Sequence, residues 1–419
     1  MTKLKILHTS DWHLGHSLHG HNRAYEHTQF LEWLLLTIKE QDIDVVIITG
    51  DIFETSMPQA SAQKMYYQFL HKLKQKLPKI QVVVIGGNHD SAMRLNAPRD
   101  LLENFGIHVV GGLSYQTDGS IDCEELIYPL YDKAGNITAW CAAVPFLHGT
   151  DLAMQDIEED VQDSFVGKIR KIYHHIINIA LSKCTPDQAL IVTGHCYMAN
   201  TELSELSERR ILGGNQHALP IDIFSDKVSY VALGHLHKPQ KVIKDHIRYS
   251  GSPIPLSMTE RNYKHQVLKV EIENNKLHNI TPILIPRFVD MLRIPNLGTL
   301  TLEKLLEELQ ALEVRADTNS NTPKPFLEVS ILMEQPEANL TQIIKQALQD
   351  KRINLVKITT EYSGSNQSLA ETNRQIQLES LSIEEVFKKC YQYRYKGEPN
   401  QELMELFHMA VQKSYEDNG

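Results

Sequence analysis

The sequence Val84-Ile85-Gly86-Gly87-Asn88-His89-Asp90 decides the fold. The β-branched run from Gln81 to Ile85 predicts a buried strand that ends at two glycines. Glycines allow a sharp turn, so the amide, imidazole and carboxylate that follow stand at the carboxyl end of this strand. Ligands of open α/β folds bind at that edge of the sheet. The stretch therefore predicts a functional site beside an α/β sheet.

The same pattern, an apolar strand that runs directly into Asp, Asn or His, occurs four more times. The polar residues at the five strand ends are Asp11 and His13, Asp51, Asn88 and His89, His195, and His235 and His237. Any one of these motifs alone would more often be a turn or a polar cap on a sheet. Five of them, each after a β run, are hard to explain by packing and predict a metal site.

The first ninety residues alternate between strands and helices. Strands are expected at 4–8, 45–48 and 81–85, with helices at 24–39 and 59–77 between them, and further strands at 107–110, 137–144, 189–193, 228–233 and 265–272. The region 113–136 is expected to be rich in turns. Strands that are apolar throughout are typical of a sheet covered on both faces. The pattern predicts an α/β fold in which two sheets form a β-sandwich flanked by helices.

The second half of the chain has a different organisation. Residues 1–284 are predicted to form the first domain, and 285–362 a small second domain with a β-α-β-α-β pattern. The Ser-, Asn- and Gln-rich residues 363–378 are typical of a linker. Residues 379–419 predict two short amphipathic helices, which are either a docking surface for a partner or a small satellite core.

Composition limits the class of protein and its environment. The five cysteines show no Cys-x-x-Cys spacing, which argues against a disulfide framework or a structural zinc site and favours the reducing cytoplasm. No apolar run reaches the roughly 18–20 residues that span a bilayer, and no secretory signal is expected. The net charge of −10 is unusual for a free-standing DNA-binding protein. Binding of DNA would therefore have to be local, assisted by metal or shared with a partner.

The residue types at the strand ends suit divalent metals, because they include imidazoles, carboxylates and an amide but no thiolate. In the Asp11/His13 and His235/His237 pairs, extended geometry would place both side chains on one face. Two ions about 3.5–4 Å apart need a bridging carboxylate, and Asp51 is the natural bridge. We predict that Asp11, His13 and His237 hold the first ion together with Asp51, and that Asn88, His195 and His235 share Asp51 on the second.

The residues beside the predicted ligands suggest how a phosphate ester would be attacked. Asn88 is neutral, so it limits the negative charge around the ions, and a water held between them would attack phosphorus. His89 is not needed as a ligand and is predicted to stabilise the developing charge or to protonate the leaving oxygen. Asp90 either orients that imidazole or caps the following helix. Most of His16, His19, His21 and His27 are expected to be loop or surface residues, and one of the four is a candidate substrate contact.

These motifs resemble those of the calcineurin-like metallophosphoesterase superfamily and, more finely, those of the SbcD family of nuclease subunits. The resemblance is carried by residues 8–15 (HTSDWHLG), 50–53 (GDIF), 87–91 (GNHDS), 194–195 (GH), 232–237 (ALGHLH), 249–257 (YSGSPIPLS) and 381–387 (LSIEEVF). In some relatives a histidine that assists catalysis stands where this chain has Glu54. A structural role is expected for Glu54, and a catalytic one is the alternative.

The resemblance implies more than a fold. It implies a cytoplasmic hydrolase in which residues 285–362 form a capping domain and residues 379–419 dock on the SMC-like ATPase SbcC. It also implies a homodimer within a heterotetramer, and two divalent ions, most commonly Mn²⁺ with Mg²⁺ as the alternative. The implied activity is cleavage of DNA as an exonuclease on double-strand ends and an endonuclease on hairpins and single strands, in DNA repair, recombination and replication.

Two other functions fit the same motifs. A phosphatase or phosphodiesterase would use the same metal scaffold, because the metals contact only the phosphate. A scaffold that tethers DNA without chemistry would lack some ligands, and none is missing. For DNA, the candidate phosphate contacts are Arg23, Arg94 and Arg261, although a surface ion pair explains each of them equally well.

Overall fold

A computed structural model describes residues 3–153, 164–202, 218–313, 323–335, 337 and 339–362, and isolated positions between 387 and 407. The chain divides into two compact units, Met1–Val289 and Asp290–Gly419. The predicted linker, 363–378, and most of the predicted C-terminal helices lie outside the described residues. No helix among the described residues is both long enough and apolar enough to cross a membrane.

The first unit contains two six-stranded sheets. The first sheet has the order β14 (Lys276–Leu284), β13 (Gln266–Glu273), β1 (Lys3–Thr9), β4 (Val45–Thr49), β5 (Gln81–Ile85), β6 (Ile107–Val110). The second has the order β11 (Gln240–Val242), β12 (Lys244–Tyr249), β10 (Tyr230–Gly234), β9 (Ala189–His195), β8 (Ile137–Ala142), β7 (Ile127–Tyr131). Strands β1, β4, β5 and β6 are parallel, as are β8, β9, β10 and β12. Antiparallel strands β13 and β14 close one edge of the first sheet, and antiparallel β11 and β7 close the two edges of the second.

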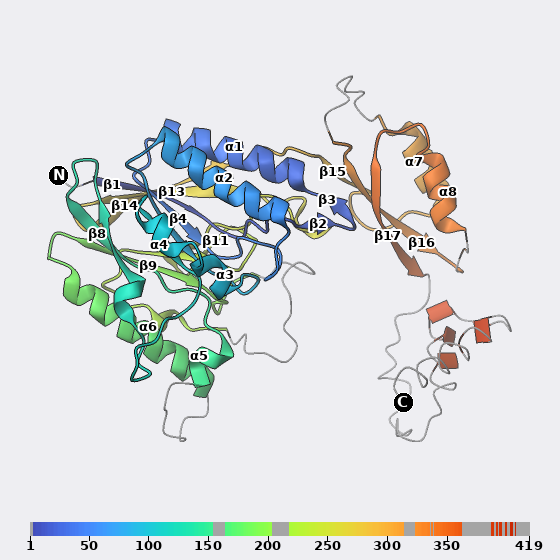
Figure 1. The fold of residues 1–419 in the computed structure, drawn as a ribbon. Coiled ribbons are helices and arrows are strands. Elements are labelled where there is room, and N and C mark those ends of the chain that lie inside the picture. Colours follow the sequence, from blue (N-terminus) through green and yellow to red (C-terminus); the bar gives the residue numbers. More distant parts are fainter. Residues whose placement is uncertain are drawn as a thin grey trace, which may run out of the picture. The chain divides into compact units, whose positions relative to one another are not determined.

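Helices cover the outer faces of the two sheets. The helices of this unit are α1 (Ala24–Glu40), α2 (Ala60–Lys76), α3 (Ala92–Asn96), α4 (Arg99–Glu103), α5 (Gly149–Ala153) and α6 (Ser164–Lys183). Helices α1 and α2 lie side by side along the first sheet, and α6 runs along the second sheet on the other side of the unit (Figure 1). Short elements complete it, namely β2 (Ser17–Leu18), β3 (His21–Asn22) and 3₁₀ turns at Cys123–Leu126, Ile221–Ile223 and Met258–Glu260.

The side chains of the central strands alternate between the two faces of the sheet, and both faces are covered. In β4, Val45 and Ile47 join the core between the sheets, whereas Val46 and Ile48 join the core beneath α1 and α2. Because successive side chains of a strand point to opposite faces, a strand with two buried faces must be apolar throughout. The predicted two-sheet sandwich flanked by helices is therefore confirmed.

Several strands were not expected from the sequence, among them β7, β12 and β14. Strand β7 lies inside the region predicted to be turn-rich, so that part of the prediction is wrong. Strands β12 and β14 carry Lys, Asp, Asn and His, so neither shows the apolar run that marks the central strands. Strands β7 and β14 each have one neighbour at a sheet edge, where one side of the strand needs no apolar partner.

The second unit has a three-stranded parallel sheet in the order β15 (Met291–Ile294), β16 (Phe326–Met333), β17 (Asn354–Tyr362). Helices α7 (Leu302–Ala311) and α8 (Leu340–Ala347) lie on one side of it (Figure 1). Their buried residues Leu305, Leu309 and Ile344 pack with the apolar residues of β16. This order of elements is the predicted β-α-β-α-β pattern.

His27 makes the first unit sensitive to acid. It is fully buried in α1, so the expectation that it lies in a loop or on the surface is wrong. Burial, helped by the nearby charge of Arg23, lowers the pKa of His27 to about 3 from its ordinary value of 6.5. The unfolded chain therefore binds a proton that the native chain does not. The resulting stability is present above pH 6.5 and is lost as the pH falls towards 3.

The substitution His27→Gln, which keeps a side chain of similar size but cannot be protonated, should reduce this loss. Between pH 7 and pH 5 we expect the wild type to lose about 2 kcal/mol more free energy of unfolding than the variant. Urea unfolding followed by fluorescence at both pH values measures the difference. Each protein serves as its own reference at pH 7, and equal losses in the two proteins would contradict the prediction.

Candidate metal centre

The strand topology brings the five motifs to one edge of the sandwich. Strands β1, β4 and β5 are parallel and in register, with Thr9 beside Ile48 and Thr49 beside Ile85, so the motifs that follow them emerge together. In the second sheet, His195 pairs with Gly234, which directly precedes His235. Both sheets therefore contribute to one site.

Several predicted ligands have a left-handed backbone. The φ angles are 53° at Asp11, 46° at His13, 49° at Asp51 and 103° at His235. These residues lie beyond the ends of their strands, so the expectation of extended geometry for the two Asp-x-His and His-x-His pairs is wrong. A left-handed non-glycine residue costs roughly 1–3 kcal/mol and is typical of functional sites. Here this backbone turns the side chains inward.

The structure brings Asp11, His13 and His237 together. All three are buried, and their candidate ligand atoms lie within 4.8 Å of one another. His13 Nε2 is a buried atom without a hydrogen-bond partner among the described residues. A buried polar atom in that state is unfavourable unless something else binds it. The two imidazoles and the carboxylate of this group are ligands that suit a divalent cation, which would bind the unpartnered nitrogen.

A second group forms around the amide of Asn88. Its Oδ1 lies 3.0 Å from His195 Nε2 and 3.1 Å from His235 Nδ1. Asp51 Oδ2 lies 3.4 Å from His195 Nε2 and 3.5 Å from His13 Nε2, so one carboxylate oxygen is close to an imidazole of each group. All seven residues predicted as ligands are therefore in one place, with Asp51 between the two groups.

Asp51 and His195 shift each other's pKa in opposite directions. Burial opposes the charge of Asp51, but the attraction of His195 outweighs it and holds the pKa of Asp51 well below its ordinary value. Burial likewise opposes a charge on His195, but Asp51 raises the pKa of this histidine above its ordinary value. A proton on His195 thus supplies positive charge that a bound cation would also supply. Binding of a cation to such a site would release protons.

His89 lies beside the two groups and is held by two contacts. Its backbone N–H donates to Asp51 Oδ1 over 2.9 Å, and its ring nitrogen Nδ1 donates to the carbonyl oxygen of Glu54 over 2.7 Å. Because a carbonyl only accepts, Nδ1 carries the proton, and Nε2 is the nitrogen that this contact leaves unused. Burial lowers the pKa of His89. The ring stands edge-on to His13, with 4.8 Å between the centroids.

Asp90 plays neither of the two roles expected for it. Its carboxylate accepts the backbone N–H groups of Ile52, Phe53 and Gly87, at 2.9–3.1 Å. The cap of helix α3 is instead Ser91, which accepts from the backbone N–H of Arg94. Asp90 therefore fixes the loops after β4 and β5 to each other. This close approach also requires Gly87, because a Cβ there would overlap the carboxylate and backbone nitrogen of Asp51.

Two carboxylates and a hydroxyl lie behind the candidate ligands; Glu54 was expected in a structural role, whereas Glu260 and Ser10 were missed from the sequence. Glu54 Oε2 lies 3.0 Å from His13 Nδ1, and Glu260 Oε1 lies 2.9 Å from His237 Nδ1. Asp11 accepts from the Ser10 hydroxyl at 2.6 Å, and that hydroxyl also contacts Ser250 at 2.7 Å. Ser250 belongs to the 249–257 motif, which directly precedes the turn that carries Glu260. The only hint in the sequence that the 249–257 segment belongs to the site was the resemblance of this motif to the family.

The three candidate DNA contacts differ in their surroundings. Arg23 is fully buried, with its guanidinium paired to Glu26 and bonded to the carbonyl oxygen of Pro255. A phosphate contact by Arg23 is therefore ruled out in this structure, because the side chain supports the 249–257 segment from within. Arg94 is exposed and Arg261 is partly exposed, so both stay predictions.

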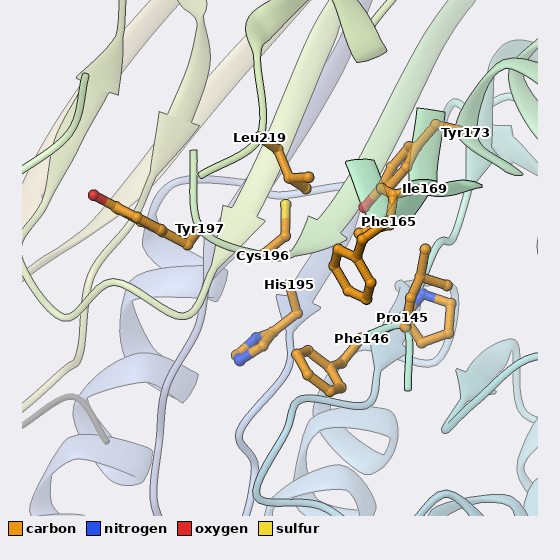
Figure 2. A pocket seen from close by; sticks show the side chains of 10 residues that line it. Pro145, Phe146, Phe165, Ile169, Tyr173, His195, Cys196, Tyr197 and Leu219 are labelled. Atoms are coloured by element: carbon orange, nitrogen blue, oxygen red, sulfur yellow. The ribbon is translucent and has the colours of Figure 1, made fainter. Parts of the chain in front are cut away.

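An apolar pocket borders His195 on the side of α6. Pro145, Phe146, Phe165 and Leu219 are among its lining residues, and the Phe146 ring faces the His195 imidazole with 6.2 Å between the centroids (Figure 2). The cavity holds only about 30 Å³, the room of one or two water molecules. A nucleoside does not fit there. The pocket serves to pack an apolar wall against one ligand histidine.

Comparison with known proteins gives a consistent family. Residues 4–239 match the calcineurin-like phosphoesterase family, and residues 287–395 match a domain described as the type 5 capsule protein repressor C-terminal domain. The SbcD subunit of the nuclease SbcCD from Rhodobacter capsulatus is 34% identical over 360 residues, which cover 85% of this chain and 87% of the relative. The SbcD subunits from Escherichia coli K12 and Bacillus subtilis 168 are each 29% identical. Those matches cover 92% of both chains for the first, and 96% of this chain and 97% of the relative for the second.

These matches extend over both units, and the phosphoesterase match includes all five motifs that meet at the edge of the sandwich. The chain therefore belongs to the SbcD family of calcineurin-like phosphoesterases.

Proposed function

We propose that this protein is a DNA nuclease that hydrolyses phosphodiester bonds with two divalent ions, Mn²⁺ in preference to Mg²⁺. The observation that carries the proposal is the place of Asp51, whose Oδ2 lies 3.5 Å from His13 of one ligand group and 3.4 Å from His195 of the other. A carboxylate shared in this way is what a two-metal phosphoesterase needs. Asp11, His13 and His237 hold the first ion, and Asn88, His195 and His235 hold the second.

The chain's own residues have distinct tasks in this reaction. When bound, the ions supply an acidified water and polarise the phosphate. Asn88 adds an oxygen ligand without adding charge. His89 is fixed through Nδ1–H by the Glu54 carbonyl, so its Nε2 can donate only when the ring is doubly protonated. In that form His89 donates a proton or a hydrogen bond from Nε2 to the phosphate oxygen on which charge develops. Asp51 keeps its carboxylate orientation through the backbone N–H of His89.

The substrate and partners follow from the relatives. Their name, as the SbcD subunit of the nuclease SbcCD, supports a nucleic-acid substrate and assembly with an SbcC subunit. We propose exonuclease action on duplex ends, endonuclease action on hairpins and single strands, and a role in DNA repair, recombination and replication. Arg94 and Arg261 are the proposed DNA contacts, and residues 285–362 the proposed capping domain.

The proposed assembly is a homodimer within a heterotetramer with SbcC in the cytoplasm, with residues 379–419 as the docking segment. Phe387 and Phe407, one from each predicted C-terminal helix, stack with 4.1 Å between their ring centroids. The cysteines of the described residues are free thiols, as a reducing compartment allows.

Purified protein should cleave DNA only with added metal. We expect Mn²⁺ to support cleavage of a hairpin, a linear duplex and a single strand, each followed on a denaturing gel, and EDTA to stop it. A generic phosphate monoester tested in parallel should be hydrolysed far more slowly. Hydrolysis of the monoester alone would favour a small-molecule phosphatase, and inertness towards every substrate with bound metal would favour a tethering subunit.

A further inference from the structure

Two carboxylates lie directly behind the histidines of the first ligand group. Glu54 Oε2 is 3.0 Å from His13 Nδ1, and Glu260 Oε1 is 2.9 Å from His237 Nδ1. A carboxylate accepts the Nδ1 proton of each ring, which leaves Nε2 to ligate. For His13 the geometry shows this directly, since its Nε2 is the nitrogen that lies 3.5 Å from Asp51 Oδ2.

The two carboxylates are themselves held in place. Glu260 is fully buried, and its second oxygen accepts the backbone N–H of Leu256 at 2.8 Å, so both of its oxygens are engaged. Glu54 is more open, with its side chain 29% exposed, but its backbone carbonyl binds His89. Each carboxylate therefore has a fixed position relative to one imidazole.

The second ligand group shows a contrast. His195 donates its Nδ1 proton to the backbone carbonyl oxygen of Thr49 at 2.9 Å, a neutral acceptor. A carboxylate acceptor makes the opposite ring nitrogen more basic than a carbonyl does, and it fixes the tautomer and the ring orientation. The imidazoles of His13 and His237 are thus better electron donors than that of His195.

We propose that Glu54 and Glu260 are positioning residues that hold His13 and His237 in the Nδ1–H tautomer and strengthen binding of the first of the two ions. This inference rests on the two-metal function proposed above. It assigns to Glu54 a role different from that of the histidine that stands at its position in some relatives, because Glu54 acts through a ligand and not on the substrate. The 249–257 motif then supports the first ligand group indirectly, because the backbone N–H of Leu256 holds the Glu260 carboxylate in place.

The variants Glu54→Gln and Glu260→Gln test the proposal. In the first, the amide oxygen still accepts from His13, so only the charge is removed. In the second, one amide oxygen must replace two acceptors, and the amide N–H₂ faces either His237 Nδ1–H or the Leu256 N–H. Loss of such a partner typically weakens metal binding about 10- to 100-fold.

The measurement is a titration of the full-length protein with Mn²⁺, in which electron paramagnetic resonance counts the free ion. We expect the wild type to bind two ions, and each variant to bind one of them about 10- to 100-fold more weakly while the other changes little. DNA cleavage by Glu54→Gln should recover at high Mn²⁺. The matched control is Glu103→Gln, which removes a partly exposed carboxylate that pairs with Arg99 away from the site, and it should bind both ions as the wild type does.

Wild-type affinities in both variants would overturn the proposal, as would equal weakening of both ions, since general loss of structure would produce that result. If Glu260→Gln does not fold, the partly exposed Glu54 decides the question alone. A wild type that binds fewer than two ions would refute the two-metal function. The positioning role would then be judged by whether Glu54→Gln weakens the ion that does bind.

Discussion

Replacement of Asp51 by asparagine is expected to lower DNA cleavage by at least about 10³-fold and to reduce bound Mn²⁺ from two ions to at most one. The reason lies in how both carboxylate oxygens are used. Oδ1 accepts the backbone N–H of His89, and Oδ2 lies between His13 and His195. An asparagine that keeps the bond to His89 turns its N–H₂ towards the ions, where it cannot ligate. An asparagine turned the other way points its N–H₂ at the backbone N–H of His89, so that two hydrogen-bond donors face each other.

Cleavage of a labelled duplex at saturating Mn²⁺, together with the Mn²⁺ titration, measures both effects. The matched control is Asp42→Asn, which makes the same change of carboxylate to amide on the surface of the same unit, where Asp42 pairs with Lys5 and Lys133. It should cleave as the wild type does. Full activity and two bound ions in Asp51→Asn would disprove the bridging role of Asp51.

Replacement of His89 by alanine is expected to slow turnover by about 10²- to 10⁴-fold while both ions stay bound. The metal groups should survive because the contact from this residue to Asp51 is made by its backbone N–H, which alanine retains. What is lost is the imidazole whose Nδ1 is held by the Glu54 carbonyl. Single-turnover cleavage measured at saturating Mn²⁺ separates the chemical step from metal loading.

A second substitution at the same position distinguishes the two tasks proposed for His89. Glutamine can donate a hydrogen bond but cannot transfer a proton at neutral pH. If His89 stabilises charge, His89→Gln should be faster than His89→Ala, and if it transfers a proton, the two variants should be equally slow. Wild-type turnover in His89→Ala would remove His89 from the reaction.

The sequence predicted the sandwich because its central strands carry a local signal. In β4 and β5, apolar residues on both faces demand cover on both faces, and a polar motif marks the carboxyl end of each strand. The candidate ligands could be brought together from that pattern because parallel strands must end at one edge. Strands β12 and β14, in which polar residues interrupt the apolar ones, carried no comparable signal.

The surroundings of the ligands could not be read in the same way, because they depend on contacts between distant segments. Glu260 reaches His237 only because the chain folds back after β12, and Arg23 is buried only because the 249–257 segment closes over it. Asp90 looked like a partner of its neighbour His89, yet its acceptors are used by backbone groups from two loops. The left-handed backbone at Asp11 and His13 is likewise imposed by the assembled site.

The distribution of the ligand set over both sheets has a consequence for biosynthesis. Asp11 is made near the start of the chain and His237 is made 226 residues later, by subtraction of their positions in the sequence. Domains fold as units when they emerge from the ribosome, and here the closing strands β13 and β14 follow the last ligand. The candidate site can therefore assemble only after nearly the whole first unit has been translated.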